Sequence, residues 1–293
     1  MPIKLTGKSM EEIPRDCLVK LQAIYDSLKT AEKKAANLLI ERPEFFSKAT
    51  IIEAAQEAGC SEATLVRLAK RLGYNGYPQL KAAIAKGRSA DSVRLYENIT
   101  EDDEYEEIVR KVFESSIRAL SDTMNVLDMN QYKKAVDTLC NAGRIVFCGV
   151  GDAAAVAMSG YQKFIRAGIN AQMSTDPDVQ LIHVSMLSKG DAVVVISHSG
   201  RTKSVMELVK HARAAGAVVI SVTNFPVSPL AKHSDVILLT AAFSEHVKGE
   251  IMAKRVPELC VLESLFINVL QRKRADLLEN LEKSNIVLEG NKL

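Results

Sequence analysis

Three hydroxyl side chains surround a glycine in ISHSGRTKS, the segment that covers residues 196–204. The hydroxyls belong to Ser197, Ser199 and Thr202, and the glycine is Gly200. A phosphate dianion needs several converging donors and a positive helix end, and a helical pattern begins directly after this loop. The spacing therefore favours an anion-binding loop over an ordinary Ser/Gly turn.

A second loop that could approach an anion is CGVGDAA, which covers residues 148–154. Gly149 and Gly151 allow close backbone approach, and a helix predicted to start near Asp152 directs its free N–H groups at the loop. A dinucleotide-binding loop is the competing interpretation, but Ala155 stands nearest to the place of its third glycine. Asp152 could bond a sugar hydroxyl or an amine, although we favour a role as helix cap.

A different chemistry is indicated by residues 51–74, which have the pattern of a helix-turn-helix. Ala55 supplies a small side chain where two helices must cross, and Gly59 accepts the left-handed backbone of a tight turn. Leu65 and Leu68 have the spacing of inward-facing residues on the second helix. We therefore expect a DNA-reading module here.

The outward face of that second helix is polar and basic, which suits a DNA major groove. Six bases and one acid occur from residue 61 to residue 88, and six acids and no base follow in residues 100–107. Early helix residues should approach base edges, and later basic residues should contact phosphates. The expected base-edge residues are Ser61, Glu62, Ala63, Thr64 and Arg67, and the expected phosphate contacts are Lys70, Arg71, Lys81 and Lys86.

The bulk composition is that of a water-soluble globular protein with room for two domains. The chain has 293 residues, 47% of them apolar and 25% charged, with a formal net charge of only +2. No apolar run reaches the roughly 20 residues that span a bilayer, and the N-terminus lacks a secretory pattern. The five cysteines form no C-x-x-C pair, so we expect reduced thiols in a cytoplasmic protein and no metal site.

The elements that must position these loops change in character near residue 128. Residues 1–86 read as an all-α helix-turn-helix domain, and residues 87–127 as a linker and connecting helix. Residues 128–275 alternate β-branched runs with helical stretches, which predicts an α/β three-layer sandwich with a parallel sheet, followed by a helical tail at 276–293. The expected strands are 144–148, 169–173, 191–197, 217–222 and 235–240.

The segment from Ser61 to Lys81 resembles the signature of the RpiR/MurR family of regulators. That signature is Ser-x-x-Thr-x-x-Arg followed by Leu-Gly-aromatic-x-Gly-aromatic, and its matches here are Ser61, Thr64, Arg67, Leu72, Gly73, Tyr74, Gly76 and Tyr77. The resemblance implies a DNA-binding regulator of sugar catabolism.

Residues 197–238 are similar to the sugar isomerase (SIS) domain, the partner domain of that family, and the two resemblances together cover roughly residues 18–275. The similarity implies that the hydroxyl loop around Gly200 holds the phosphate of a sugar and that no cofactor is needed. It adds Thr223 as a secondary ligand residue and Arg255 as a match to a family arginine. The family usually has Ser where Ala153 stands, so one hydroxyl contact is missing.

Isomerases also use the SIS fold, so an enzyme is the main alternative to a sensor. Isomerisation needs a base near the sugar carbons, and the candidates are Glu250, Glu263 and His246. None lies in a recognisable catalytic pattern, and fusion to a DNA-reading domain favours a sensor that is not an enzyme. We expect operator DNA, a phosphorylated sugar and a second copy of the chain, as homodimer or tetramer, to be its partners. Residues 243–255 fit either a lid or a dimer contact.

Overall fold

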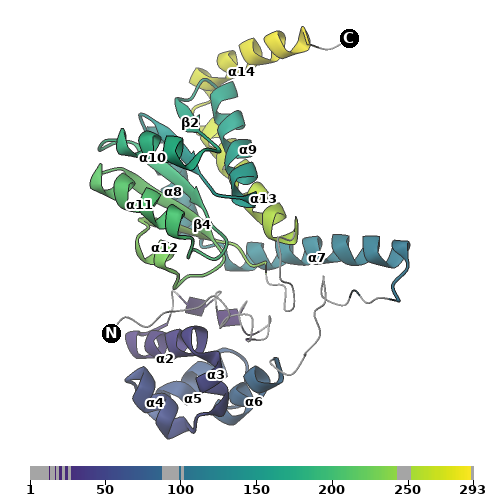
Figure 1. Cartoon of the computed structure of the whole chain (residues 1–293), viewed down its shortest axis with the longest axis vertical. Helices are drawn as coiled ribbons and strands as arrows, with labels where there is room; N and C mark the ends of the chain where they lie inside the picture. Colours follow the sequence, from purple (N-terminus) through teal and green to yellow (C-terminus); the bar gives the residue numbers. More distant parts are fainter. Residues whose placement is uncertain are drawn as a thin grey trace. The chain divides into compact units, whose positions relative to one another are not determined.

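The computed structural model describes residues 28–87, 102–242 and 252–291, together with positions 13, 17, 20, 21, 24, 25 and 99. The chain divides into two compact units (Figure 1). The helical unit takes in residues 1–126 and 243–251, and the α/β unit takes in residues 127–242 and 252–293. No helix in the described ranges is both long and apolar enough to cross a membrane.

The helical unit follows the signals for helix starts and ends that the sequence contains. Thr50 accepts a hydrogen bond from the Glu53 backbone at 3.3 Å, and Glu53 in turn accepts one from the Thr50 backbone at 2.7 Å. Gly59 ends the following helix in the left-handed conformation, with φ 61°. The helices are α2 (Thr30–Glu41), α3 (Pro43–Lys48), α4 (Ile51–Ala58), α5 (Glu62–Arg71), α6 (Tyr77–Gly87) and α7 (Tyr105–Val126).

The core of the helix-turn-helix lies where α2 packs on α4 and α5, and α3 packs on α6. Leu65 and Leu68 are fully buried, as the spacing predicts. The Tyr77 hydroxyl donates to the carbonyls of Phe46 and Ala49 at 3.2 and 3.1 Å, which satisfies the end of α3 from inside the core. Helix α5 itself packs on α2, α4 and α6.

The α/β unit confirms the predicted parallel sheet covered on both faces. Its strands are β1 (Ile145–Cys148), β2 (Ala171–Met173), β3 (Ala192–Ile196), β4 (Val218–Thr223) and β5 (Val236–Leu239). They pair in the order β2-β1-β3-β4-β5, all parallel. The helices are α8 (Met129–Asn141), α9 (Asp152–Arg166), α10 (Pro177–Ser185), α11 (Lys203–Ala214), α12 (Pro229–Lys232), α13 (Met252–Arg272) and α14 (Arg274–Glu289).

Alternate strand residues enter two separate apolar cores, one on each face of the sheet. Phe147, Val194 and Ile220 pack with residues of α8, α9 and α13, whereas Val146 and Val193 pack with residues of α10 and α11. Figure 1 shows the helices on the two sides of the strands. This burial on both faces explains why the strands read as continuous apolar runs.

Candidate functional site

The strand order places both predicted anion loops beyond the carboxyl ends of two neighbouring strands, β1 and β3. After β1 the chain adds β2 on one side of β1, and it then adds β3, β4 and β5 on the other side, so the strand order reverses between β1 and β3. Ligands of open parallel sheets bind beyond the carboxyl ends of strands at such a reversal. Loop 1 (residues 149–151) follows β1 and loop 2 (residues 197–202) follows β3, which pairs directly with β1.

Loop 2 is a tight corner before α11 and contains the three predicted hydroxyls. Gly200 has φ +59° and its N–H donates to the Ser197 carbonyl at 3.1 Å, which closes the turn. Ser197 is buried, and the Ser199 hydroxyl accepts the Arg201 N–H at 3.3 Å. Thr202 occupies the N-cap position of α11 without a side-chain cap bond. The three predicted hydroxyls therefore lie at the same corner as the free N–H groups at the start of α11.

Two buried residues after β4 hold loop 2 in place. The Thr223 hydroxyl donates to the His198 carbonyl at 3.2 Å, and the Asn224 N–H donates to the same oxygen at 3.0 Å. Both side chains are fully buried. Thr223, predicted from resemblance as a secondary ligand residue, thus supports the loop backbone, and Asn224 is a supporting residue that sequence reasoning missed.

His198 brings a neutral imidazole to the same corner. Burial, with smaller effects of Lys254 and Arg255, lowers the pKa of His198 to about 3. Its Nδ1 is buried and has no hydrogen-bond partner among the described residues. The ring therefore remains uncharged at neutral pH, and its Nδ1 is available to form a hydrogen bond.

Loop 1 is held by two hydrogen bonds with a glutamine side chain, which the sequence pattern did not indicate. The Gln180 side chain accepts the Gly149 N–H at 3.3 Å and donates to the Gly149 carbonyl at 3.0 Å. Gln180 is 1% exposed although it lies on a helix that the pattern predicts only as a cover of the sheet. A Cβ at Gly149 would lie 2.5 Å from the Ala153 carbonyl oxygen, so only glycine fits this turn.

Asp152 pairs with Arg255 and does not cap its helix, so the capping expectation is wrong. The N-cap residue of α9 is Gly151, and Asp152 is the first helical residue. Arg255 donates from Nε to Asp152 at 2.9 Å and from Nη1 to Glu258 at 2.7 Å. Arg255 is thereby brought to the first residue of α9, which directly follows loop 1.

Glu258 is fully buried, and its Oε1 has no hydrogen-bond partner among the described residues. Burial raises the pKa of Glu258 to about 7 against the opposing effect of Arg255. The cluster of Asp152, Arg255 and Glu258 therefore contains two carboxyl groups and one guanidinium.

Ala153 is 4% exposed and packs into the apolar core beneath α9. Glu263, one of the three base candidates, pairs with Lys163 on the neighbouring helix α9. Glu250 and His246, the other base candidates, lie outside the described residues, as do residues 243–251 of the predicted lid or dimer contact.

In the helical unit, α5 exposes part of the predicted DNA face. Ser61 caps the helix by accepting the Thr64 N–H at 3.3 Å. One side of α5 and its cap is exposed, and it carries Ser61, Glu62, Ala63, Arg67 and Lys70. This side presents a helix N-terminus and two cations, which is the arrangement that a major-groove helix needs.

Three predicted DNA-contacting residues make contacts within the helical unit, and for Arg71 and Lys81 the phosphate contact stays a prediction. Thr64 is 1% exposed, so its predicted place on the outward face is wrong, and its hydroxyl accepts from Arg67 at 3.1 Å. Arg71 pairs with the buried Glu32 at 3.1 Å. Lys81 donates to the carbonyls of residues 48 and 49 at 2.8 and 2.9 Å, at the end of α3. The side chain of Lys86 is outside the described part of the chain.

Comparison with protein families matches both units of the chain. Residues 15–91 match a helix-turn-helix domain of the rpiR family, and residues 138–268 match a SIS domain. An uncharacterised HTH-type transcriptional regulator of Thermotoga maritima is 32% identical over 275 residues, which cover 93% of this chain and 98% of the relative. HexR, an HTH-type transcriptional regulator of Pseudomonas aeruginosa, is 32% identical over 92% of this chain and 94% of its own.

Solved structures give the same picture of the fold. Vibrio vulnificus NanR, complexed with ManNAc-6P, has a TM-score of 0.62 and 25% identity, covering 94% of this chain and 99% of NanR. The sugar isomerase domain of an RpiR transcription factor from Sphaerobacter thermophilus has a TM-score of 0.56 at 22% identity, covering 61% of this chain and 98% of that domain.

Proposed function

Because the chain belongs to the rpiR family of helix-turn-helix transcriptional regulators with a SIS domain, we propose that a phosphorylated sugar bound in its α/β unit controls its affinity for operator DNA. It is a regulator and not an enzyme, like its named relatives. The proposal assigns DNA reading to residues 1–86, connection to residues 87–127 and ligand binding to residues 128–275. In this proposal the protein lies in the cytoplasm, which contains both operator DNA and sugar phosphates.

We infer the ligand site mainly from the pairing of β1 with β3, because the strand order reverses there. Loop 2 supplies Ser197, Ser199 and Thr202 with the start of α11, which together fit a phosphate. Gly149, Gly151 and the cluster around Arg255 face the sugar end of the same crevice in this proposal. NanR, a structural relative, was solved with a phosphosugar, which supports the same ligand class here.

The chain acts as a homodimer or tetramer in this proposal, and ligand binding changes how its two DNA-reading units fit an operator. Paired recognition helices fit half-sites about one helical turn apart, or about 34 Å. Coupling between the ligand and DNA would be about 1–3 kcal/mol, a change of about 5- to 150-fold in operator affinity.

Ser199→Ala should abolish stabilisation of the full-length chain by phosphorylated sugars. A ligand at 100 times its Kd adds about 2.7 kcal/mol to the free energy of unfolding, which a thermal-shift panel detects easily. Each sugar phosphate is compared with its unphosphorylated parent. Ser185→Ala, which removes a hydroxyl bonded to the Ile182 carbonyl at the end of α10, is the matched control. A full response in the Ser199 variant would place the phosphate elsewhere.

Arg67→Ala should lower operator affinity by about 1–3 kcal/mol and relax the preference for operator over unrelated DNA. Lys70→Ala should weaken binding to both DNAs alike and reduce the salt slope by about 1, because it contacts phosphate. The operator is selected from random oligonucleotides by the wild-type chain, and affinities are measured by fluorescence anisotropy at several salt concentrations. Unchanged specificity in the Arg67 variant contradicts base reading by this side chain.

A further inference from the structure

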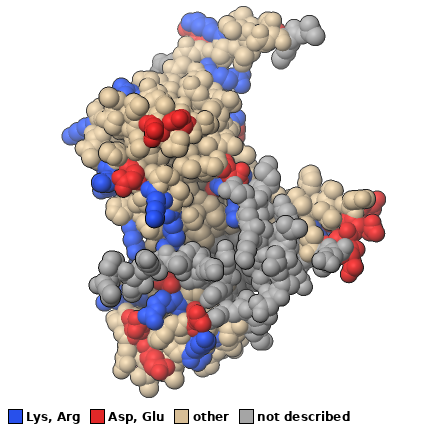
Figure 2. Space-filling view, in the orientation of Figure 1, with Lys and Arg blue, Asp and Glu red and all other residues tan. Residues whose placement is uncertain are grey.

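Helix α7 carries a row of apolar side chains on its exposed side. The row has one member every four residues: Tyr105 (87% exposed), Val109 (57%), Phe113 (66%) and Ile117 (63%). Residues at this spacing lie on one face of a helix. Single exposed apolar side chains are common on proteins, whereas a continuous row marks an interaction surface. Figure 2 shows the tan surface of α7, with acidic side chains at its right-hand end.

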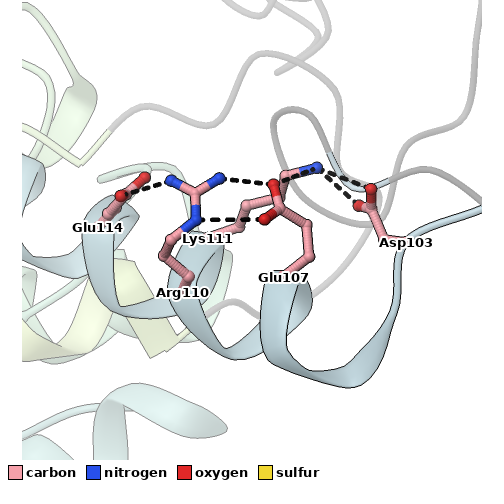
Figure 3. A network of polar contacts seen from close by, with 5 residues as sticks. All are labelled: Asp103, Glu107, Arg110, Lys111 and Glu114. Carbon is pink, nitrogen blue, oxygen red and sulfur yellow. Dashed lines mark hydrogen bonds and ion pairs between the residues drawn. The ribbon is translucent and has the colours of Figure 1, made fainter.

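A row of charges with alternating sign runs beside the apolar row, one position further along the chain. Its members are Glu106, Arg110, Glu114, Arg118 and Asp122. Arg110 donates to Glu107 at 2.5 Å and to Glu114 at 2.7 Å, and Lys111 donates to Asp103 at 2.8 Å (Figure 3). Two members of the charged row, Arg110 and Glu114, are therefore held in place on the helix surface.

The alternation of sign makes this surface complementary to itself in one orientation only. In a parallel pair of α7 helices each residue faces its own copy, so Arg110 would meet Arg110 and Glu114 would meet Glu114. In an antiparallel pair with its two-fold axis at position 112, Arg110 faces Glu114 of the second copy, and Glu106 faces Arg118. Opposite charges across a contact select orientation and register more than they add affinity.

We propose that α7 pairs in antiparallel orientation with α7 of a second copy of this chain, with the two-fold axis at position 112. The pairing specifies how the homodimer of the proposed function is held, and rests on that function only for the expectation of a dimer.

The same register also brings the apolar rows together. Phe113 lies one residue, or about 1.5 Å, from the axis, so the two phenyl rings meet at the centre. Val109 faces position 115 of the second copy, beside Ile117, and Tyr105 faces position 119. An axis at 116 would also match the charges, but it leaves Tyr105 opposite position 127, beyond the end of α7. The axis at 112 therefore buries more of the row.

Phe113→Ser should raise the Kd of the full-length dimer by about 100-fold or more, because two phenyl rings per dimer lose their burial. Sedimentation velocity over a concentration series measures this. Met124→Ser is the matched control: Met124 is 81% exposed but faces position 100, before the start of α7 in the second copy. Equal effects of the two variants, or a monomeric wild type at micromolar concentration, would overturn the pairing.

Arg110→Glu alone and Glu114→Arg alone should each weaken the dimer, because like charges then face each other across the axis. Mixing the two variants should restore a heterodimer, since glutamate at position 110 meets arginine at position 114. Charge reversal within one helix is unaffected by mixing, so this rescue reports the contact between copies. A parallel pair instead predicts that neither single change weakens association, and that result would reject the proposed orientation.

The phosphosugar response is measured on the same variants. A monomeric Phe113→Ser chain that retains the response supports the pairing separately from ligand binding. A Phe113→Ser chain that still dimerises overturns the pairing whether or not it responds to the ligand. Circular dichroism confirms the fold in each case, and the exposure of Phe113 in the single chain makes loss of folding unexpected.

Discussion

Arg255→Met should lower the free energy of unfolding of the α/β unit by about 3–5 kcal/mol at pH 8. The guanidinium is the hydrogen-bonding partner of Glu258, which is fully buried, and Arg255 itself is 8% exposed. Removing the arginine takes away the counter-charge of Glu258, so the folded chain must either bury an unpaired carboxylate or bind a proton that the unfolded chain does not hold at pH 8. Methionine preserves most of the packing volume. Urea unfolding of the full-length chain, followed by far-UV circular dichroism, measures the loss.

The double variant Arg255→Met/Glu258→Gln separates charge from packing. If the buried carboxyl group causes the loss, the amide should recover most of the stability, because it needs neither a counter-charge nor a bound proton. A double variant as unstable as the single one would mean that the arginine stabilises the fold through its packing and its bond to Asp152.

The stability that depends on Glu258 should fall as pH rises through about 7. Burial raises the pKa of Glu258 from 4.5 to about 7, with Asp152 also raising it and Arg255 and Lys254 lowering it. The folded chain therefore binds a proton that the unfolded chain has released, so acidification from pH 8 to 6 stabilises it. We expect the difference in unfolding free energy between wild type and Glu258→Gln to change with pH in this sense, and more steeply in an Arg255→Met background. A difference that is flat between pH 6 and 8 would show that Glu258 does not titrate there.

The elements of both units were predictable because their signals are local. Thr50 and Gly59 mark the two ends of α4 by hydrogen bonding and backbone conformation within a few residues. The β-branched runs predicted the five strands, because both faces of a parallel sheet are buried. The hydroxyls of loop 2 were equally visible, since they lie within six residues.

The contacts that complete the site were not predictable, because they join distant parts of the chain. Arg255 and Asp152 are 103 positions apart, and Gln180 is 31 positions from the glycine it clamps. The burial of Thr64 has a local cause: side chains point toward the helix N-terminus, so a hydroxyl three residues after the cap meets Ser61 at 2.9 Å. Thr223 matches a ligand position by type, whereas its bond to the His198 carbonyl in loop 2 depends on the packing of β4 against that loop and has no local signal.

Gly200→Ala should abolish the phosphosugar response and lower the free energy of unfolding by about 2–4 kcal/mol. Gly200 has φ +59°, and a Cβ there would lie 2.3 Å from the Ser228 hydroxyl and 2.6 Å from the Ser228 Cβ. Ser228 is fully buried and accepts the Ala231 N–H at 3.2 Å, so it has no room to retreat. The loop must move instead, which displaces the hydroxyls from the start of α11.

Gly190→Ala is the matched control, because Gly190 has φ +97° but a Cβ there would have no atom of the described residues within 4 Å. It should incur the backbone strain of about 1–2 kcal/mol and leave the ligand response intact. The double variant Gly200→Ala/Ser228→Gly removes both close contacts and should regain part of the response, although it loses the cap of α12. Thermal shifts with and without sugar phosphate measure all three variants. A wild-type response in Gly200→Ala would mean that the shape of loop 2 does not govern phosphate binding, since the substitution cannot be accommodated without moving that loop.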